Sequence, residues 1–398
     1  MQSARKSNQD KASAEQHMEL VNVTRKPGAY SIATDKTGQV WLFIVTKASY
    51  GFPIGPTEEP LPLDDQAPLV MTDEFTGEPG FSAIRAENDF APRKPRCDVL
   101  LIGCCYAPNG RPAKRVRVSL QVGTMTKFFD VVGNRFWEPD YFLGVAPSQP
   151  ETFTVMPISY DNAYGGVDEP TPDPLTHSWY PTNHVGLGFR PRTAPERLSG
   201  EALPNTEEER IPISEPNGNY RPMAFGPLGR SWRQRIKWGG TYDDSWRKTK
   251  YPFLPDDFDD RYFQSAPEDQ QVDYLKGGEK VVMVNLTPHG RVEFRLPKFS
   301  EPITIVYKSG ERRRISSVVD TLMLEPELKR FSLSQRASLH LRRNAHEILK
   351  IELGPVFPQP LPEDGEQQIA VAKPRYKSLS DLIAAQRATR HSREGTRR

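Results

Sequence analysis

Six aspartates lie between residues 243 and 260, close enough in sequence for some of their carboxylates to converge on one cleft. They are Asp243, Asp244, Asp256, Asp257, Asp259 and Asp260. Two carboxylates beside a glycosidic bond supply the acid and the base of a glycoside hydrolase, and several carboxylate oxygens together can hold a divalent cation. One hypothesis is therefore a carbohydrate-active hydrolase that uses two of the first four aspartates.

The surroundings of these aspartates favour a structural role instead. The segment lacks the D-x-[DN]-x-[DN]-G pattern of a calcium-binding loop, and aromatic residues such as Trp246 and Phe258 alternate with the acidic ones. Aspartates in such loops commonly cap turns or pair with nearby arginines, here Arg247 and Arg261. We expect aromatic anchors beneath a solvated acidic surface, and no catalytic residues.

Other patterns for catalysis, metal binding or cofactor binding are missing from the sequence. His177 and His184 do not have a zinc-ligand spacing, and the three cysteines, at positions 97, 104 and 105, read as small buried apolar residues. The chain has no G-x-S-x-G elbow and no phosphate-binding loop. The sequence therefore predicts no metal, no cofactor and no enzyme activity.

Arginine and tryptophan interleave in residues 229–238, GRSWRQRIKW. Such side chains can stack on bases and hold phosphates, which makes a nucleic-acid-binding protein a second alternative. The same residue types supply most of the binding energy of protein interfaces, and a net charge of only +2 favours a protein partner. The residues expected to contact this partner are Trp179, Tyr180, Arg230, Trp232, Arg233, Arg235, Trp238, Trp246, Leu382 and Ile383.

The elements that must position these residues are mostly strands. The 38 prolines and 28 glycines among 398 residues make long helices improbable. Residues 116–123 alternate apolar and polar side chains, as a half-buried strand does, and 127–137 follow as a hairpin partner. A second hairpin is expected over 284–294. The predicted fold class is mainly β, a β-rich α+β body of antiparallel sheets, sandwich-like, with few short helices.

Between residues 161 and 277 the periodicity fades, and proline, glycine, tryptophan and aspartate dominate. We expect a long loop layer there, with one short helix over 265–278 that Ser265 caps and Gly277 ends. The double glycine at 165 and 166 allows a sharp reversal or a close approach to another segment. We expect a tight reversal there, where a strand leaves the sheet for the long loop region.

The expected domain organisation has four parts. Residues 1–20 are predicted to be disordered, and 21–355 form the β-rich domain, with possible sub-domains over 21–160 and 278–355 joined by 161–277. A proline-rich linker over 356–372 leads to a basic amphipathic arm over 373–398, which contains eight Lys or Arg and only two acidic residues. Without a signal peptide or a run of about 20 apolar residues, a cytoplasmic location is expected.

Several segments in a fixed order carry a resemblance to a known family. They include KPRCDVLLIGCCYAPNGRPAKRVRVSLQVG, PISYDNAYGGVDEP, YPTNHVGLGF, MAFGPLGRSWRQRIKWGGTYDDSW and FLPDDFDDRYF. Over about residues 30–325 the chain resembles a bacterial family of adaptor proteins, long described as a domain of unknown function, encoded beside type VI secretion spike and effector genes. The chain departs from the family pattern at two places: residues 160–164 lack a charged pair, and His184 stands where the family has a proline.

The resemblance implies a non-enzymatic adaptor or chaperone that binds an effector, or its PAAR-like segment near the spike, and helps to load it onto the VgrG spike. The implied partners are therefore the effector and a spike component, with no small-molecule substrate and no membrane; nucleic acid is the less favoured partner and stays the second alternative. The residues that match the family motifs, and so mark architecture, are Tyr164, Gly165, Gly166, Asn183, Gly186, Gly188, Phe225, Gly226, Pro227, Trp232, Gly240, Thr241, Asp243, Trp246, Pro255, Asp256, Asp257 and Phe258.

Overall fold

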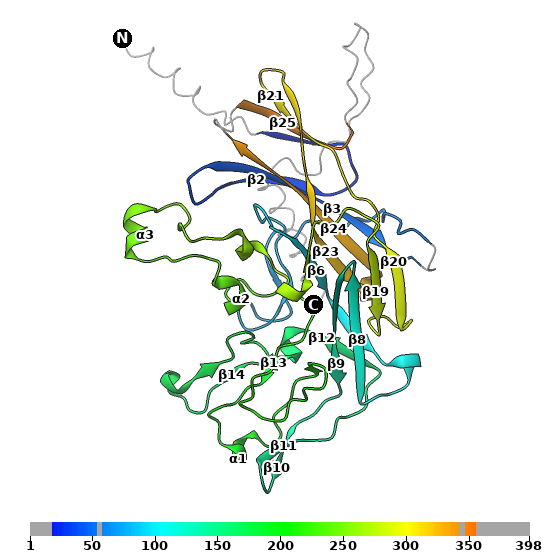
Figure 1. Cartoon of the computed structure of the whole chain (residues 1–398), viewed down its shortest axis with the longest axis vertical. Helices are drawn as coiled ribbons and strands as arrows, with labels where there is room; N and C mark the ends of the chain where they lie inside the picture. The colour runs from blue at the N-terminus through cyan, green and yellow to red at the C-terminus, as the bar shows by residue number, and fades with distance from the viewer. Residues whose placement is uncertain (1–17, 54–57, 342–346, 356–398) are drawn as a thin grey trace, which may run out of the picture. The chain divides into compact units, whose positions relative to one another are not determined.

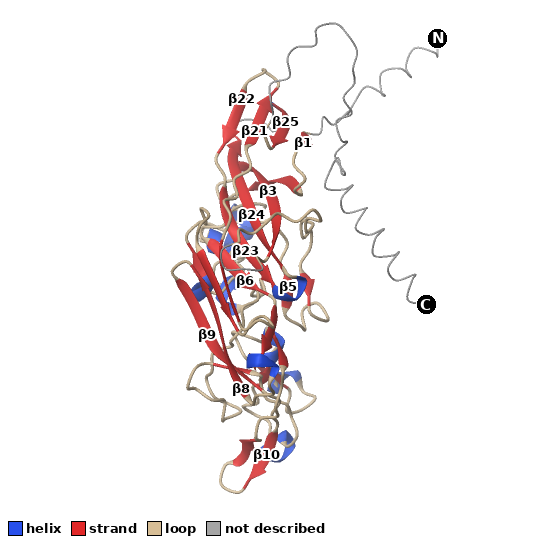
Figure 2. Ribbon diagram, turned by 90° about the vertical axis from the view of Figure 1, so that its right-hand side faces the viewer, coloured by secondary structure: helices blue, strands red, loops and turns tan. Residues whose placement is uncertain are grey.

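The computed structural model describes residues 18–53, 58–341 and 347–355. In this part of the chain strands dominate and the three α-helices are short, as the sequence predicts (Figure 2). The chain divides into two compact units. Of the described residues, unit 1 comprises 18–24, 301–316, 339–341 and 347–355, and unit 2 comprises 25–53, 58–300 and 317–338. Of the possible sub-domains expected over 21–160 and 278–355, residues 25–160, 278–300 and 317–338 lie in unit 2.

Unit 2 is built on two large sheets (Figure 1). The six-stranded sheet has the order β18 (Gln271–Val272), β6 (Cys97–Leu101), β23 (Val318–Glu325), β24 (Arg330–Leu341), β3 (Val40–Gly51) and β2 (Gly28–Thr34). The five-stranded sheet has the order β17 (Thr206–Glu207), β9 (Met125–Val132), β8 (Arg115–Val122), β19 (Lys280–Val284) and β20 (Arg291–Arg295). Both expected hairpins are confirmed, as β8–β9 and β19–β20.

The main core lies between these two sheets. The alternating residues of β8, Val116, Val118 and Leu120, are buried, as the sequence pattern predicts. They belong to one apolar cluster with residues of the six-stranded sheet such as Val99 and Leu322. Two sheets that bury facing apolar side chains in this way form a sandwich.

Five small two-stranded sheets complete unit 2. Their pairs are β4 (Glu74–Phe75) with β5 (Ile84–Ala86), β7 (Gly103–Tyr106) with β12 (Val155–Ile158), β10 (Trp137–Asp140) with β11 (Gly144–Pro147), β13 (Tyr164–Gly165) with β16 (Leu187–Gly188), and β14 (Val167–Asp168) with β15 (Ser178–Trp179). The helices are α1 (Pro195–Leu198), α2 (Arg233–Ile236) and α3 (Asp244–Thr249). The pairs β13–β16 and β14–β15, the three helices and single 3₁₀ turns belong to the loop layer over 161–277.

The helix expected over 265–278 is wrong except for one 3₁₀ turn, Glu268–Gln270. Ser265 does not cap it, because its backbone N–H and hydroxyl both donate to the buried carboxylate of Asp98. Val272 then pairs with Cys97 at the edge of the six-stranded sheet. Tertiary hydrogen bonding and strand pairing therefore override the local capping signal.

In unit 1, four strands form one sheet in the order β1 (Glu19–Asn22), β25 (Ile348–Leu353), β21 (Ile303–Tyr307) and β22 (Arg312–Ile315). Its centre is apolar, with Ile305 and Ile351 fully buried. β1 begins at Glu19, inside the segment 1–20 that the sequence predicts to be disordered. Residues 1–17, the linker 356–372 and the arm 373–398 lie outside the described residues.

Candidate functional site

The α3 loop, residues 239–258, leaves the body of unit 2 after α2 and returns to it at Phe258 (Figure 1). Its two ends are tied together by the carboxylate of Asp257, which accepts hydrogen bonds from the backbone N–H and the hydroxyl of Thr241 at 2.9 and 2.7 Å. Gly240 makes the sharp entry possible with a φ of 81°. The loop is therefore closed at its base.

Helix α3 orders the interior of this loop. Asp243 is its N-cap and accepts the Trp246 backbone N–H at 2.8 Å, which satisfies a donor that the first helical turn leaves free. The indole N–H of Trp246 donates to the carbonyl of Phe253 at 2.9 Å. The Trp246 ring also packs edge-on against Tyr242 and Tyr251, with centroids 4.7 and 5.8 Å away.

The α3 loop is also fastened to the turn between β2 and β3. The ammonium group of Lys36 donates to the carbonyls of Asp256 and Phe258 at 3.1 and 3.2 Å. The Phe253 ring lies over Gly38 so closely that a Cβ there would sit 3.1 Å from the ring. The aromatic side chains of the loop are thus held by a strand hairpin of the six-stranded sheet.

Aromatic side chains lie on the surface of this loop among exposed polar and charged ones. We call Tyr242, Trp246, Tyr251 and Phe253 the α3 patch. Trp246 is half-buried, whereas 55% of Tyr242, 69% of Tyr251 and 38% of Phe253 remain exposed. Exposed aromatic clusters on a fixed backbone are typical of binding surfaces.

Each aspartate of the hydrolase hypothesis has a local structural partner. Asp243 caps α3 and Asp257 closes the loop, while Asp244 pairs with Arg247 at 3.0 Å and Asp256 pairs with Lys250 at 2.6 Å.

These hydrogen bonds also affect ionisation. Bonds from the backbone and side chain of Thr241 lower the pKa of Asp257, whereas a general acid needs a raised pKa. Asp259, another aspartate of the cluster, pairs with Arg261 at 2.7 Å. The predicted roles of these aspartates, capping turns and pairing with nearby arginines, are therefore confirmed.

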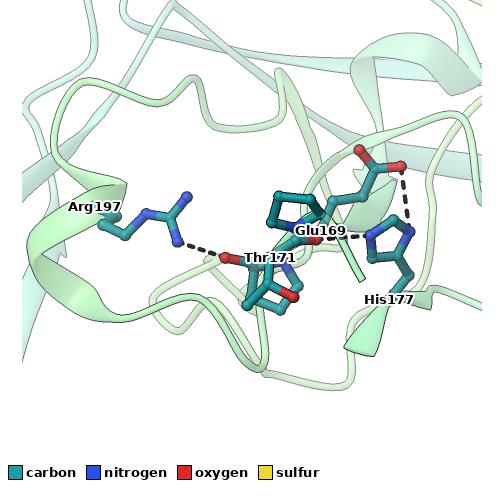
Figure 3. A pocket seen from close by; sticks show the side chains of 6 residues that line it. Glu169, Thr171, His177 and Arg197 are labelled. Carbon is teal, nitrogen blue, oxygen red and sulfur yellow. Dashed lines mark hydrogen bonds and ion pairs between the residues drawn. The ribbon is translucent and has the colours of Figure 1, made fainter. Parts of the chain in front are cut away.

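A depression elsewhere in the loop layer is lined by Glu169, Pro170, Thr171, Pro172, His177 and Arg197 (Figure 3). The guanidinium of Arg197 donates to the Pro170 carbonyl at 2.5 Å, and His177 Nε2 lies 2.9 Å from the Thr171 carbonyl. The polar groups are therefore engaged in shaping the turn after β14, and none of the six aspartates lines the depression. Among the described residues, no group of three or more His, Cys, Asp or Glu is placed to hold a metal ion.

The ten expected contact residues differ in their exposure to solvent. Trp179 is 62% exposed and Arg233 is exposed, whereas Arg230, Trp238 and Trp246 are half-buried. Three others are buried inside unit 2 and cannot present their side chains to a partner: Tyr180, Trp232 and Arg235. Leu382 and Ile383 lie outside the described residues.

The buried members have internal partners that the sequence does not reveal. Arg235 forms an ion pair with Glu87 at 2.7 Å and also donates to the Leu228 carbonyl. Trp232 packs edge-on against Tyr160, 5.1 Å between centroids. Trp232 and Arg235 of segment 229–238 are therefore part of the core, which weakens the motivation for nucleic-acid binding.

Gly165 ends the short strand β13, and Gly166 lies between it and β14. Gly165 has a φ of 152°, and a Cβ on it would clash with the carbonyl of Asn183. Asn183 is fully buried and donates its side-chain amide to the carbonyls of Tyr160 and Tyr164 at 2.8 and 3.0 Å. Close approach to Asn183, and not the expected tight reversal, is therefore what requires glycine at 165, since no turn separates β13 from β14.

The other motif residues also serve packing. Tyr164 is fully buried and donates its hydroxyl to the Gly218 carbonyl at 2.8 Å. Phe225 packs on Phe129 with centroids 4.7 Å apart. Four more are buried, namely Gly188, Gly226, Pro227 and Pro255, and Gly186 leaves no room for a Cβ beside the Ala163 carbonyl.

Sequence reasoning missed several exposed aromatic residues. Tyr242 and Tyr251 of the α3 patch were not among the expected contacts, and neither were Tyr141 and Phe142, which are 94% and 89% exposed. A usable signal existed for the last two, because the apolar run 141–143 stands between Asp140 and Gly144, which are turn-forming residues.

Comparison with known protein families gives one match. Residues 37–336 match the family described as uncharacterized protein conserved in bacteria (DUF2169). The chain belongs to this family. The match covers the α3 patch and all the expected contact residues except Leu382 and Ile383. No curated protein and no solved structure matches the chain. Among the described residues of this family member, no helix is long and apolar enough to cross a membrane.

Proposed function

We propose that this chain is a non-enzymatic adaptor that binds a type VI secretion effector, or its PAAR-like segment near the spike, and helps to load it onto the VgrG spike. The observation that carries the proposal is the α3 patch, a set of exposed aromatic side chains on a closed and anchored loop. The identity of the partner comes from the resemblance of residues 30–325 to the adaptor family, whose motifs follow one another in the same order.

Anchoring matters because binding is stronger when the contact surface is already ordered. Immobilising a rotamer-rich side chain on binding costs about 0.5–1.5 kcal/mol. In the α3 patch the Trp246 ring is already fixed by its bond to the Phe253 carbonyl and by its contacts with Tyr242 and Tyr251. An effector segment would therefore meet a surface that loses little further freedom.

The non-enzymatic part of the proposal rests on the roles of the clustered carboxylates. Asp243 and Asp257 shape the loop that carries the patch, and Asp244 and Asp256 pair with neighbouring cations. These aspartates support the binding surface instead of facing a substrate.

Size sets a limit on what the patch can do alone. A specific complex buries about 800 Å² on each partner, and an aromatic side chain buries about 150–250 Å². Three exposed rings therefore provide a part of such an interface, and the surface around them must supply the rest. An interface in which only the aromatic rings bind strongly also allows the effector to be released, since the spike can compete for the more weakly binding surface around them.

Co-expression with the effector encoded beside this chain tests the proposal. We expect the effector to accumulate in soluble form and to be secreted with the wild-type chain, and to lose both properties when the chain is deleted. The variant Tyr251→Ala should reproduce part of that loss, while Phe81→Ala, which removes an equally apolar ring that is 78% exposed elsewhere, should not. An effector that is equally soluble, abundant and secreted without the chain would contradict the adaptor function.

A further inference from the structure

Three consecutive exposed apolar side chains lie at the tip of the β10–β11 hairpin, outside the α3 patch. We call Tyr141, Phe142 and Leu143 the hairpin tip; they are 94%, 89% and 72% exposed. A run of three exposed apolar residues is unfavourable in water, so its presence points to a function. Both views place this hairpin at one end of unit 2, and Figure 1 shows it well apart from α3.

The hairpin tip is a built structure. The carboxylate of Asp140 accepts the backbone N–H groups of Phe142 and Leu143 at 2.9 and 2.8 Å. Gly144 closes the three-residue loop with a φ of 78°, the conformation that such hairpins favour after a turn. The rings of Tyr141 and Phe142 also pack edge-on, 5.2 Å between centroids.

The stem of the hairpin is anchored in its own small core. Trp137 of β10 and Val145 of β11 are buried, 1% and 4% exposed, in a cluster that includes Leu198 of α1. The side chain of Pro195 fills the space beside Gly144. A fixed stem therefore holds an apolar tip out in solvent.

We infer that the hairpin tip inserts into an apolar pocket of a folded protein partner, and that the rim of this pocket is basic. The hairpin itself carries the acidic residues Glu138 and Asp140 and has no Lys or Arg between residues 137 and 147. An anionic lipid surface recruits Lys and Arg, so the charge of the hairpin disfavours a membrane and complements a basic rim. This inference does not depend on the identity of the partner at the α3 patch.

The first experiment asks what lies next to the hairpin tip in the cell. A benzophenone amino acid is placed at position 142, and at position 81 as an equally exposed control, and irradiated in the source bacterium. We expect one discrete protein adduct from position 142 and none from position 81. The adducted protein is then purified, and its Kd for the wild-type chain and for two matched variants is measured.

Phe142→Ser should raise that Kd by roughly 30-fold, the effect of removing a central anchor, whereas Phe81→Ser should leave it unchanged. Asp140→Asn keeps an acceptor for the two backbone N–H groups and removes the charge, so it should reduce the salt dependence of binding more than the affinity. Asp140→Ala should weaken binding further, because the tip loses its fixed shape.

Three results would overturn the inference. They are the absence of an adduct at position 142, an adducted partner whose Kd Phe142→Ser leaves unchanged, and co-sedimentation of the wild-type chain with phosphatidylcholine or phosphatidylglycerol vesicles that Phe142→Ser abolishes. Failure of the adaptor function is separate, since it shows in the solubility and secretion of the effector with Tyr251→Ala, while position 142 still gives its adduct.

Discussion

Replacing Asp98 by asparagine should destabilise unit 2 more than any exposed substitution in it. The fully buried carboxylate of Asp98 on β6 accepts five hydrogen bonds. The donors are the ammonium of Lys94 at 2.8 Å, the amide of Gln264 at 2.6 Å, the backbone N–H and hydroxyl of Ser265 at 2.9 and 3.1 Å, and the backbone N–H of Ala266 at 3.1 Å. This one side chain thus ties the end of the loop layer to the six-stranded sheet.

The magnitude follows from what the substitution leaves behind. Lys94 is only 5% exposed. Burial by itself lowers its pKa, but the carboxylates of Asp98 and Asp320 and of Glu87 more than offset that effect, so its net pKa is raised. Breaking a buried ion pair on one side costs about 3–5 kcal/mol. Since small proteins are stable by about 5–15 kcal/mol, Asp98→Asn should remove a large share of the total.

Urea denaturation, monitored by tryptophan fluorescence, measures this effect. Asp256→Asn is the matched control, because Asp256 forms an exposed ion pair with Lys250 that should contribute less than about 1 kcal/mol. Equal midpoints for the two variants would refute the reasoning that Asp98 holds the loop layer on the sheet.

Three further predictions concern other parts of unit 2. Burial, partly offset by Asp269, lowers the pKa of Lys127 to about 8, below its value of about 10.4 in an unfolded chain. Between these two pH values the unfolded state binds more protons than the folded state, so the free energy of unfolding should rise from pH 8 to 9.5. Lys127→Met should flatten that rise in urea titrations. Gly165→Ala should lower the free energy of unfolding by about 3 kcal/mol or more, because its Cβ meets the Asn183 carbonyl; an unchanged urea midpoint would contradict this. Asp257→Ala opens the α3 loop at Thr241 and should speed limited proteolysis within 239–258 while leaving the global melting temperature nearly unchanged; an unaltered cleavage pattern would mean that other contacts close the loop.

Local pattern was a good guide where one face of a strand is buried. The alternation of Val116, Val118 and Leu120 predicts β8 because inward residues recur every second position, and turn residues around Gly290 predict the β19–β20 hairpin. These features depend on neighbours in sequence, so a single sequence contains them.

Contacts between residues far apart in sequence could not be predicted from the sequence. Arg235 read as an exposed contact, yet its partner Glu87 is 148 residues away. Ser265 read as a helix cap, but Asp98, 167 residues earlier, takes both of its donors. The unit 1 sheet combines three separate stretches of chain, and nothing in the strand Glu19–Asn22 alone indicates its neighbour β25.

Exposure within the loop layer was the hardest property to predict for the candidate site. Trp179 and Trp232 have the same side chain in similar proline- and glycine-rich surroundings, but one is 62% exposed and the other 3%. The difference arises because Trp232 meets Tyr160 in the core, whereas Trp179 lies at a two-residue strand with one pairing partner. Residue type indicates a binding layer, and only packing decides which rings remain available.

The most direct measurement of the central claim is the affinity between the purified chain and the effector encoded beside it, by isothermal titration calorimetry. The account predicts that the wild-type chain binds, that the double variant Tyr242→Ala and Tyr251→Ala weakens binding by roughly 30-fold or more, and that Phe81→Ala has no effect. Equal affinities for all three proteins, or no binding by the wild-type chain, would contradict it.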